Sequence, residues 1–223
     1  MTNHTFGYNE LIYLLQGAKW TVILTILAFA GGSILGFIVA VMRVSRNYLI
    51  RLLSAVFIFL IQGTPLLVLL FIAFFGLSLL GTNLPGLLAA AIVMTLYSAA
   101  FLGEIWRGCF EAIPAPQWMA ARALALSRSQ QLRYVIVPQA ARIAVAPTVG
   151  FLVQIVKNTS VTALIGFVEL ARAGQLVHNA TFQPGRVFLC VGALYFIICF
   201  PLSVLARWLE GRLNVGRAVI RGA

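Results

Sequence analysis

The sequence predicts an all-α membrane protein with about five membrane-spanning helices, and three observations lead to this fold class. First, 61% of the 223 residues are hydrophobic and 9% are charged, whereas about 25% of the residues in a soluble domain are charged. Second, the apolar residues form long runs, and a membrane-spanning helix needs about 20 of them. Third, most of the 16 Lys and Arg residues fall in connections that the alternation of spans places on one side.

Five apolar runs are expected to form the spans. They cover Trp20–Met42, Leu53–Leu80, Leu84–Leu102, Ile143–Phe167 and Val187–Ala206. Pro65 lies inside the second run, where a proline removes a backbone donor and can kink a helix. That kink can either shape packing or form a substrate-lining turn. Polar residues interrupt the end of the fourth run, and Glu169–Asn179 behind it suits a short helix at the outer surface.

The arginines predict the orientation of the chain. Three lie between the first and second runs, five between the third and fourth, and four after the fifth. Cytoplasmic connections carry an excess of Lys and Arg, so we expect the N-terminus outside and the C-terminus in the cytoplasm. The net charge of +11 then reflects orientation, and no nucleic-acid partner is expected. The chain does not start with a basic stretch followed by an apolar run, so the first span is expected to act as an uncleaved insertion signal.

The sequence has no internal repeat, and we expect residues 1–223 to form one transmembrane domain with a core at about 17–210. Gly31, Gly32 and Gly36 suit close helix contacts, either inside the subunit or at a subunit interface. The 3 cysteines lack metal-ligand spacing and the 2 histidines are isolated, so no metal site is predicted. The sequence has neither a nucleophile-elbow motif nor a G-x-x-x-x-G-K-[ST] loop. We therefore expect no enzyme activity and no cofactor in this chain.

The longest connection contains a basic, alanine-rich stretch, WMAARALALSRSQQLRYVIVPQAAR, at Trp118–Arg142. Strong helix formers dominate this stretch, which predicts one or two short helices lying along the membrane. On composition alone, it fits at least as well a basic loop that touches anionic membrane lipid.

MAARALALSRSQQLRYVIVPQAAR resembles the cytoplasmic signature loop of ATP-binding cassette (ABC) importer permeases. That loop has the form E-A-A, a glycine four residues after the second Ala, and a distal aliphatic-Pro pair. Ala120, Ala121, Val137 and Pro138 match it. Three further stretches resemble the polar amino-acid branch of this family: QGTPLLVLLF from Gln62, SAAFLGEIWRGCFEAIPAPQW from Ser98 and KNTSVTALIGFVELAR from Lys157. The similarity covers nearly the whole chain in the correct order.

The resemblance implies the type I importer permease fold, with coupling helices between spans three and four in a cytoplasmic loop at about residues 108–140. It implies a bacterial inner-membrane permease subunit of an ATP-driven importer for polar amino acids. The implied partners are a second permease subunit (identical or homologous), a cytoplasmic ATPase dimer that binds ATP and Mg, and an extracytoplasmic amino-acid-binding protein. The implied contacts to the ATPase are Met119, Ala120, Ala121, Ala123, Leu124, Ala125, Leu126, Ser127, Arg128 and Arg133.

Two positions depart from the family pattern. Met119 stands where the family has an acid, and Ala125 stands where it has a glycine. A glycine between two short helices usually takes a positive φ, which costs alanine about 1 kcal/mol or more. Either the turn here has a negative φ, or the strain is tolerated.

A lysine inside the fourth run is the leading candidate for substrate contact. An intramembrane lysine is costly and suggests function by default, although Lys157 can also snorkel or pair with a neighbouring chain. Asn158, Thr159 and Ser160 add polar groups at the same place, and the resemblance puts substrate contacts near this segment. We expect Lys157 to attract a substrate carboxylate, which favours neutral-polar or acidic amino acids.

Further candidates for the substrate pathway lie in the second and third runs. Gln62, Gly63 and Thr64 directly precede the proline of the second run and can line a substrate path. Glu104 lies three residues before Arg107, so both face the same side of a helix. The two can form an ion pair at the membrane interface, or Glu104 can act as a gate or contact a substrate ammonium group.

Two other classes of protein are weighed against the permease subunit. A stand-alone channel or ion-coupled carrier would work without an ATPase, and it usually shows internal symmetry or intramembrane acids. A membrane-embedded enzyme would need a positioned nucleophile, a metal cluster or an acid–base pair. The sequence offers none of these features, so the permease subunit is preferred.

Overall fold

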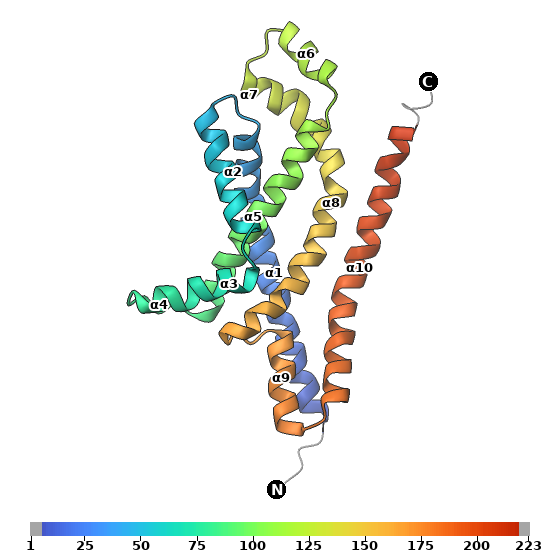
Figure 1. Ribbon diagram of the computed structural model, residues 1–223. Helices are drawn as coiled ribbons and strands as arrows, with labels where there is room; N and C mark the ends of the chain where they lie inside the picture. Colours follow the sequence, from blue (N-terminus) through green and yellow to red (C-terminus); the bar gives the residue numbers. More distant parts are fainter. Residues whose placement is uncertain (1–5, 219–223) are drawn as a thin grey trace.

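The computed structural model describes residues 6–218, with side chains described as far as residue 212. Every regular element in this range is a helix (Figure 1). The elements are α1 (Tyr8–Arg43), α2 (Tyr48–Gln62), α3 (Leu66–Phe71), η1 (Ile72–Gly76), α4 (Leu77–Leu79), α5 (Gly86–Glu111), α6 (Ala115–Ala123), α7 (Arg128–Gln130), η2 (Gln131–Ile136), α8 (Val137–Asn158), η3 (Thr159–Ile165), α9 (Leu170–Thr181) and α10 (Pro184–Ala218). The predicted all-α fold class is confirmed.

Four helical stretches are long and apolar enough to cross a membrane alone. They are Tyr8–Arg43, Gly86–Glu111, Arg128–Ile165 and Pro184–Arg212. A fifth crossing requires α2 and the stretch from α3 to α4 to count as one span, although the two bend by 98° where they meet. The predicted number of about five spans agrees with this arrangement. The second span, expected over Leu53–Leu80, is corrected to two helices with a sharp break.

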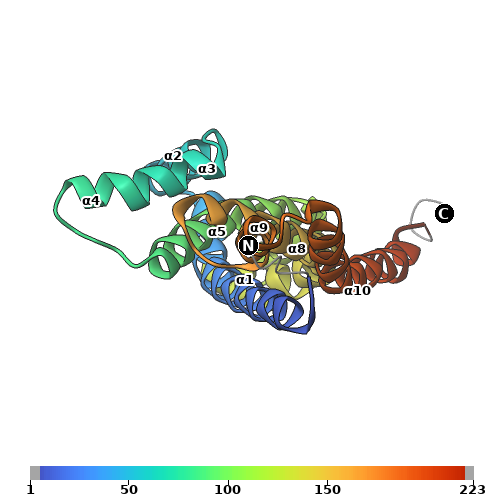
Figure 2. The same ribbon diagram turned by 90° about the horizontal axis from the view of Figure 1, so that it is seen from below.

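The break follows from the sequence Gly63-Thr64-Pro65. A proline lacks the backbone N–H that a helix needs, and it disfavours the helical conformation at the preceding residue. α2 accordingly ends at Gln62 and α3 begins at Leu66, while Pro65 takes an extended conformation with φ −56° and ψ 138°. Beyond the break, α3, η1 and α4 form an arm that projects sideways from the bundle (Figure 2).

α1 and α5 share the most extensive contact in the bundle. Small residues allow this approach, because a Cβ on Gly32 would lie 2.4 Å from Ser98 Cβ. A Cβ on Gly31 would lie 2.8 Å from Thr95 Cγ2, and one on Gly36 would lie 3.1 Å from the Ala99 carbonyl oxygen of α5. These three glycines therefore serve packing inside the subunit, which is one of the two roles predicted for them.

The two ends of the bundle carry different elements. At one end, α9 packs on α1 and α10 (Figure 1), and this helix confirms the short helix expected over Glu169–Asn179. α6 and α7 lie at the opposite end. We call these the α9 end and the α6 end. α1 begins at the α9 end and α10 finishes at the α6 end (Figure 1), an arrangement that fits an odd number of membrane crossings.

Candidate functional site

The basic loop between the third and fourth spans folds into short helices, as predicted. α6 starts after Pro114, whose φ of −55° suits a helix N-terminus. α7 starts with a capping box, in which Ser127 Oγ accepts a hydrogen bond from the Gln130 N–H and Gln130 Oε1 accepts one from the Ser127 N–H, at 2.8 Å. The helix continues through η2 into α8, with Pro138 in the first turn of α8. The loop is therefore an ordered pair of helices.

Ala125 occupies the turn between α6 and α7 with a positive φ of 54°. Its N–H donates to the Arg122 carbonyl at 2.9 Å, and the Leu126 N–H donates to the Ala121 carbonyl at 3.3 Å. This is the hydrogen-bond pattern of a Schellman C-cap, in which glycine usually holds the position of Ala125. Of the two alternatives at this turn, the one in which strain is tolerated is correct.

The loop presents some of the predicted coupling residues outward and holds others inside the subunit. The exposed ones are Met119, Ala120, Ala123, Leu124, Ala125, Ser127 and Arg133. Ala121 is buried, and Leu126 is half-buried. Arg128 is held within the subunit, since its guanidinium lies 4.3 Å from the centre of the Trp118 ring and donates to the Val44 carbonyl at 3.1 Å. The exposed residues of α6 are thus mostly apolar, with Gln117 and Arg122 as the polar ones.

Lys157 borders a cavity of about 460 Å³ between α8, η3 and α10. Its side chain is exposed in the single subunit, within the span Arg128–Ile165. Ser160 and the aromatic residues Tyr195, Phe196 and Phe200 line the same cavity. The lining of the cavity therefore includes one cation, Lys157, and two serines, Ser160 and Ser203, in a wall that is otherwise largely apolar.

The other polar residues beside Lys157 turn toward the backbone or a neighbour. Thr159 is fully buried and its hydroxyl donates to the Val156 carbonyl at 2.7 Å. Asn158 accepts a hydrogen bond from Gln154 Nε2 at 3.0 Å. Of the four predicted residues in this segment, Lys157 and Ser160 are the ones that line the cavity.

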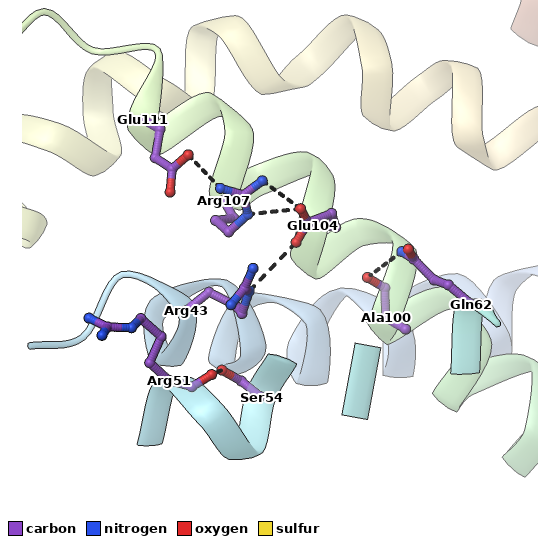
Figure 3. A network of polar contacts seen from close by, with 8 residues as sticks. All are labelled: Arg43, Arg51, Ser54, Gln62, Ala100, Glu104, Arg107 and Glu111. Atoms are coloured by element: carbon purple, nitrogen blue, oxygen red, sulfur yellow. Dashed lines mark hydrogen bonds and ion pairs between the residues drawn. The ribbon is translucent and has the colours of Figure 1, made fainter. Parts of the chain in front are cut away.

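The predicted pathway residues of the second and third spans lie elsewhere. Gln62 Nε2 donates to the Ala100 carbonyl of α5 at 3.3 Å (Figure 3). Thr64 donates to the Leu60 carbonyl at 2.8 Å, and Gly63 forms the C-cap of α2 between them. None of these three residues lines the cavity beside Lys157.

Glu104 lies in an ion-pair network (Figure 3). Arg107 donates to Glu104 Oε1 from Nε at 2.9 Å and from Nη2 at 2.5 Å, and it also pairs with Glu111. Arg43 Nε of α1 lies 3.7 Å from Glu104 Oε2. The predicted ion pair between Glu104 and Arg107 is present, and the network ties α1 to α5.

Glu169 is a buried acid whose environment the sequence did not reveal. Its side chain is fully buried and caps α9, accepting hydrogen bonds from the backbone N–H groups of Ala171 at 2.9 Å and Arg172 at 2.8 Å. The Tyr195 hydroxyl donates to it at 2.7 Å, and the Thr21 hydroxyl of α1 lies at 3.4 Å. Burial raises the pKa of the Glu169 carboxyl, and these hydrogen bonds oppose the rise. Its place before a helix was the available signal, because a negative charge is favourable near a helix N-terminus.

Glu169 also connects the α9 end to the Lys157 cavity. The Tyr195 ring lines that cavity, and its hydroxyl is held by the Glu169 carboxylate. The carboxylate itself is enclosed, so it supports the cavity wall without facing the cavity.

Comparisons with known proteins agree with this architecture. Residues 32–215 match the family model of the binding-protein-dependent transport system inner membrane component. The probable glutamine ABC transporter permease protein GlnM of Bacillus subtilis (strain 168) is 31% identical over 212 residues, which cover 95% of this chain and 98% of GlnM. The glutamine transport system permease protein GlnP of Escherichia coli (strain K12) is 32% identical over 204 residues, covering 91% of this chain and 93% of GlnP.

A solved structure shows the same fold. The crystal structure of an amino acid ABC transporter with histidines contains a chain that superposes with a TM-score of 0.84 at 29% identity, covering 93% of this chain and 99% of that chain. The family, the relatives and this structure confirm the resemblance to ABC importer permeases, which are transport proteins and not themselves enzymes. The match over most of its length shows that the chain belongs to the family of binding-protein-dependent transport system inner membrane components.

Proposed function

We propose that the chain is a permease subunit of an ATP-driven importer for amino acids, and that it forms the translocation pathway together with a second permease subunit. The position of Lys157 carries this proposal. A lysine facing hydrocarbon costs about 3 kcal/mol near the centre of a spanning helix, and Gln154, one turn away, is exposed beside it. This face of α8 is therefore suited to a polar pathway or another subunit, and poorly suited to lipid.

The substrate class follows from which charged side chains are not already paired or enclosed within the subunit. Lys157 can attract a substrate carboxylate. The Ser160 hydroxyl donates to the Lys157 carbonyl at 2.7 Å, so toward a substrate it can act as an acceptor. A basic substrate side chain would need a free acid, but Glu104 is paired with arginines and Glu169 is enclosed. These charges favour neutral-polar or acidic amino acids, as do the glutamine permeases among the relatives.

The coupling role belongs to the α6 end. The side chains of Met119, Ala120, Ala123 and Leu124 are exposed and form an apolar surface. This surface suits close docking of a cytoplasmic ATPase dimer, which binds ATP and Mg. Cytoplasmic connections carry an excess of Lys and Arg, so we propose that this arginine-rich end faces the cytoplasm and that the protein lies in a bacterial inner membrane. The α9 end and the N-terminus are then outside, where a substrate-binding protein would deliver the amino acid. We propose that residues 1–223 form one transmembrane domain.

Replacement of Lys157 tests the substrate site. We expect Lys157→Ala to reduce glutamine uptake by the reconstituted complex by roughly tenfold to hundredfold, because a hydrogen bond to a charged group contributes about 1.5–3 kcal/mol. Lys19→Ala is the matched control, since Lys19 is also exposed but lies on α1 near the α9 end. ATPase association should be unchanged in both variants. Uptake kinetics of Lys157→Ala equal to those of the unmodified complex would refute the site.

A further inference from the structure

A basic cavity lies beside α6 and borders the surface that we assign to the ATPase. Its volume is about 680 Å³, and its walls come from the end of α1, the start of α2, the end of α5 and α6. Its charged lining consists of Arg43, Arg51, Arg122, Arg128 and Glu111. The exposed side chain of Met119 also lines it. A partner that docks on this surface of α6 therefore meets the cavity.

The glutamates near this cavity are already paired. Glu111 pairs with Arg107, and Glu104 is shared between Arg107 and Arg43 (Figure 3). These two carboxylates balance the charge of the two arginines that they contact. α6 itself contains no acidic residue. Among the described residues, no carboxylate other than that of Glu111 lines the cavity.

The remaining arginines of the cavity have no acidic partner in the described part of the chain. None of the ion pairs among residues 6–212 involves Arg51, Arg122 or Arg128. Arg128 Nε is buried and, among the same residues, has no hydrogen-bond partner. Arg51 Nη1 lies 3.5 Å from the Ser45 carbonyl oxygen, which is neutral. Like charges gathered around one space repel one another, so the cavity favours an anionic group.

Docking of a partner on α6 would take one of these charges out of water. Arg122 follows Met119 by three residues, so the two side chains share one side of α6, and both line the cavity. A partner that covers Met119 therefore also approaches the exposed guanidinium of Arg122. Burial of a charged group is strongly unfavourable unless an opposite charge pairs with it. A partner surface that fits this place therefore carries an acid.

We propose that this cavity receives the carboxylate of an aspartate or glutamate of the ATPase subunit that docks on α6, an assignment that rests on the proposed function. A guanidinium fork can donate two parallel hydrogen bonds to a carboxylate. Arg51 and Arg122 are exposed and contact the incoming acid. Arg128 forms the inner wall, because the Trp118 ring and the Val44 carbonyl hold its guanidinium in place.

The size and position of the cavity favour a protein side chain over a small soluble anion. One water molecule occupies about 30 Å³, so an inorganic ion would fill only a small part of the space. A side chain together with the segment that carries it can fill more of it. Since Met119 belongs to both the cavity and the docking surface, the acid can come from the partner that covers α6. Contact with Arg51 would also connect that partner to α2, the first half of the second span.

Binding of the purified ATPase subunit to the full-length permease in phosphatidylcholine nanodiscs, which contain no anionic lipid, tests the proposal. We expect Arg51→Gln/Arg122→Gln to weaken binding by about 30-fold, because truncation of one side of a buried charge pair leaves the other charge unpaired. Binding by the unmodified permease should also fall more steeply with rising salt than binding by this variant. Arg142→Gln/Arg207→Gln removes the same charge from exposed positions on α8 and α10, outside the cavity, and should leave binding unchanged.

A zero-length crosslink identifies the group that enters the cavity. Arg122→Lys keeps the charge, should keep most of the binding, and supplies an amine that a carbodiimide couples to a contacting carboxylate. Lys19 and Lys157 are the two lysines of the natural chain, and neither lines the cavity. We expect the new amine to form an amide bond with an aspartate or glutamate of the ATPase, located by mass spectrometry. The matched variant Arg142→Lys should form no such bond.

Each outcome decides the assignment. Equal losses in the two glutamine variants would show a diffuse charge effect and overturn the site. If the ATPase bound Arg122→Lys without forming the crosslink, no ATPase carboxylate would enter the cavity, and another anion such as a lipid headgroup would have to fill it. Loss of binding in Arg122→Lys as large as in the double glutamine variant would also contradict the proposal.

The proposed function is tested separately by the same measurements. An unmodified permease that does not bind the ATPase would refute the function itself. Binding that is lost in Leu124→Glu but kept in Arg51→Gln/Arg122→Gln would refute only the pairing of the cavity with an acid of the ATPase.

Discussion

At Ala125 the chain adopts a conformation that a side chain disfavours. The positive φ of Ala125 strains the folded state by about 1–2 kcal/mol. A glycine would relieve this strain, but it would also lower the free energy of unfolding by about 0.4–1 kcal/mol, because it gives the unfolded chain more conformational freedom. Relief of strain outweighs that entropy, so we expect Ala125→Gly to stabilise the subunit by roughly 0.5–1 kcal/mol. Thermal unfolding of the purified variant would measure the gain.

The same substitution two residues earlier is the control for Ala125→Gly. Ala123 is exposed at the end of α6, in ordinary helical conformation, so Ala123→Gly should destabilise the subunit by up to about 1 kcal/mol. Opposite signs at the two positions would confirm the strain. If both glycine variants were destabilised, the turn at Ala125 would carry no backbone strain.

Lys157 and Glu169 show which residues of the candidate site a sequence can reveal. Lys157 was predictable because a charge inside a long apolar run is conspicuous. Glu169 lies just beyond the run, and its burial depends on Tyr195, 26 positions away, and on Thr21, 148 positions away. Such partners are brought together by the packing of three helices. For the same reason, the sequence could not show that Lys157 would border a cavity beside α10 while Gln62 would contact α5.

At the scale of the elements, the contact between α1 and α5 depends on the absence of side chains. A Cβ at Gly32 would come within 2.4 Å of Ser98 Cβ. We expect Gly32→Ala to destabilise the subunit, because overpacking costs about 1–3 kcal/mol and exceeds the gain in helix propensity of about 1 kcal/mol. Thermal unfolding in detergent would measure the loss.

Gly192 offers the matched comparison for this contact. It lies in the interior of α10, and a Cβ there would meet nothing within 4 Å. Gly192→Ala should therefore be neutral or slightly stabilising, since only helix propensity changes. If both alanine variants proved equally stable, the close approach of α1 to α5 would not hold.

The helices were predictable from the sequence to different degrees. Apolar runs indicated the spans because a bilayer imposes one length on all of them. The proline at position 65 indicated an irregularity, but the angle of 98° depends on how α3 packs on η3 and α5. The arginines close to the ends of the spans pointed to the basic end of the bundle, while the cavity that they form there required the folded arrangement.

At the scale of the whole molecule, coupling to an ATPase requires a surface that can transmit force to the spans. α6 is suited to this because Arg128 and Trp118 anchor the loop to the end of α1, so that a push on α6 reaches the bundle. Leu124, 73% exposed at the end of α6, lies at the outer edge of this surface. We expect Leu124→Glu to weaken ATPase association by about tenfold or more, because burying an unpaired charge at an interface costs several kcal/mol.

Co-purification of the ATPase with the permease would measure this effect. Thr82→Glu adds the same charge at an exposed position in the connection between α4 and α5, away from α6, and should leave association intact. Both variants should elute as the unmodified permease does in size-exclusion chromatography, since neither side chain is buried. If Leu124→Glu retained the ATPase as fully as Thr82→Glu, the docking surface would have to lie elsewhere. The rigid link from α6 through Arg128 to α1 would then serve only to hold the loop in place.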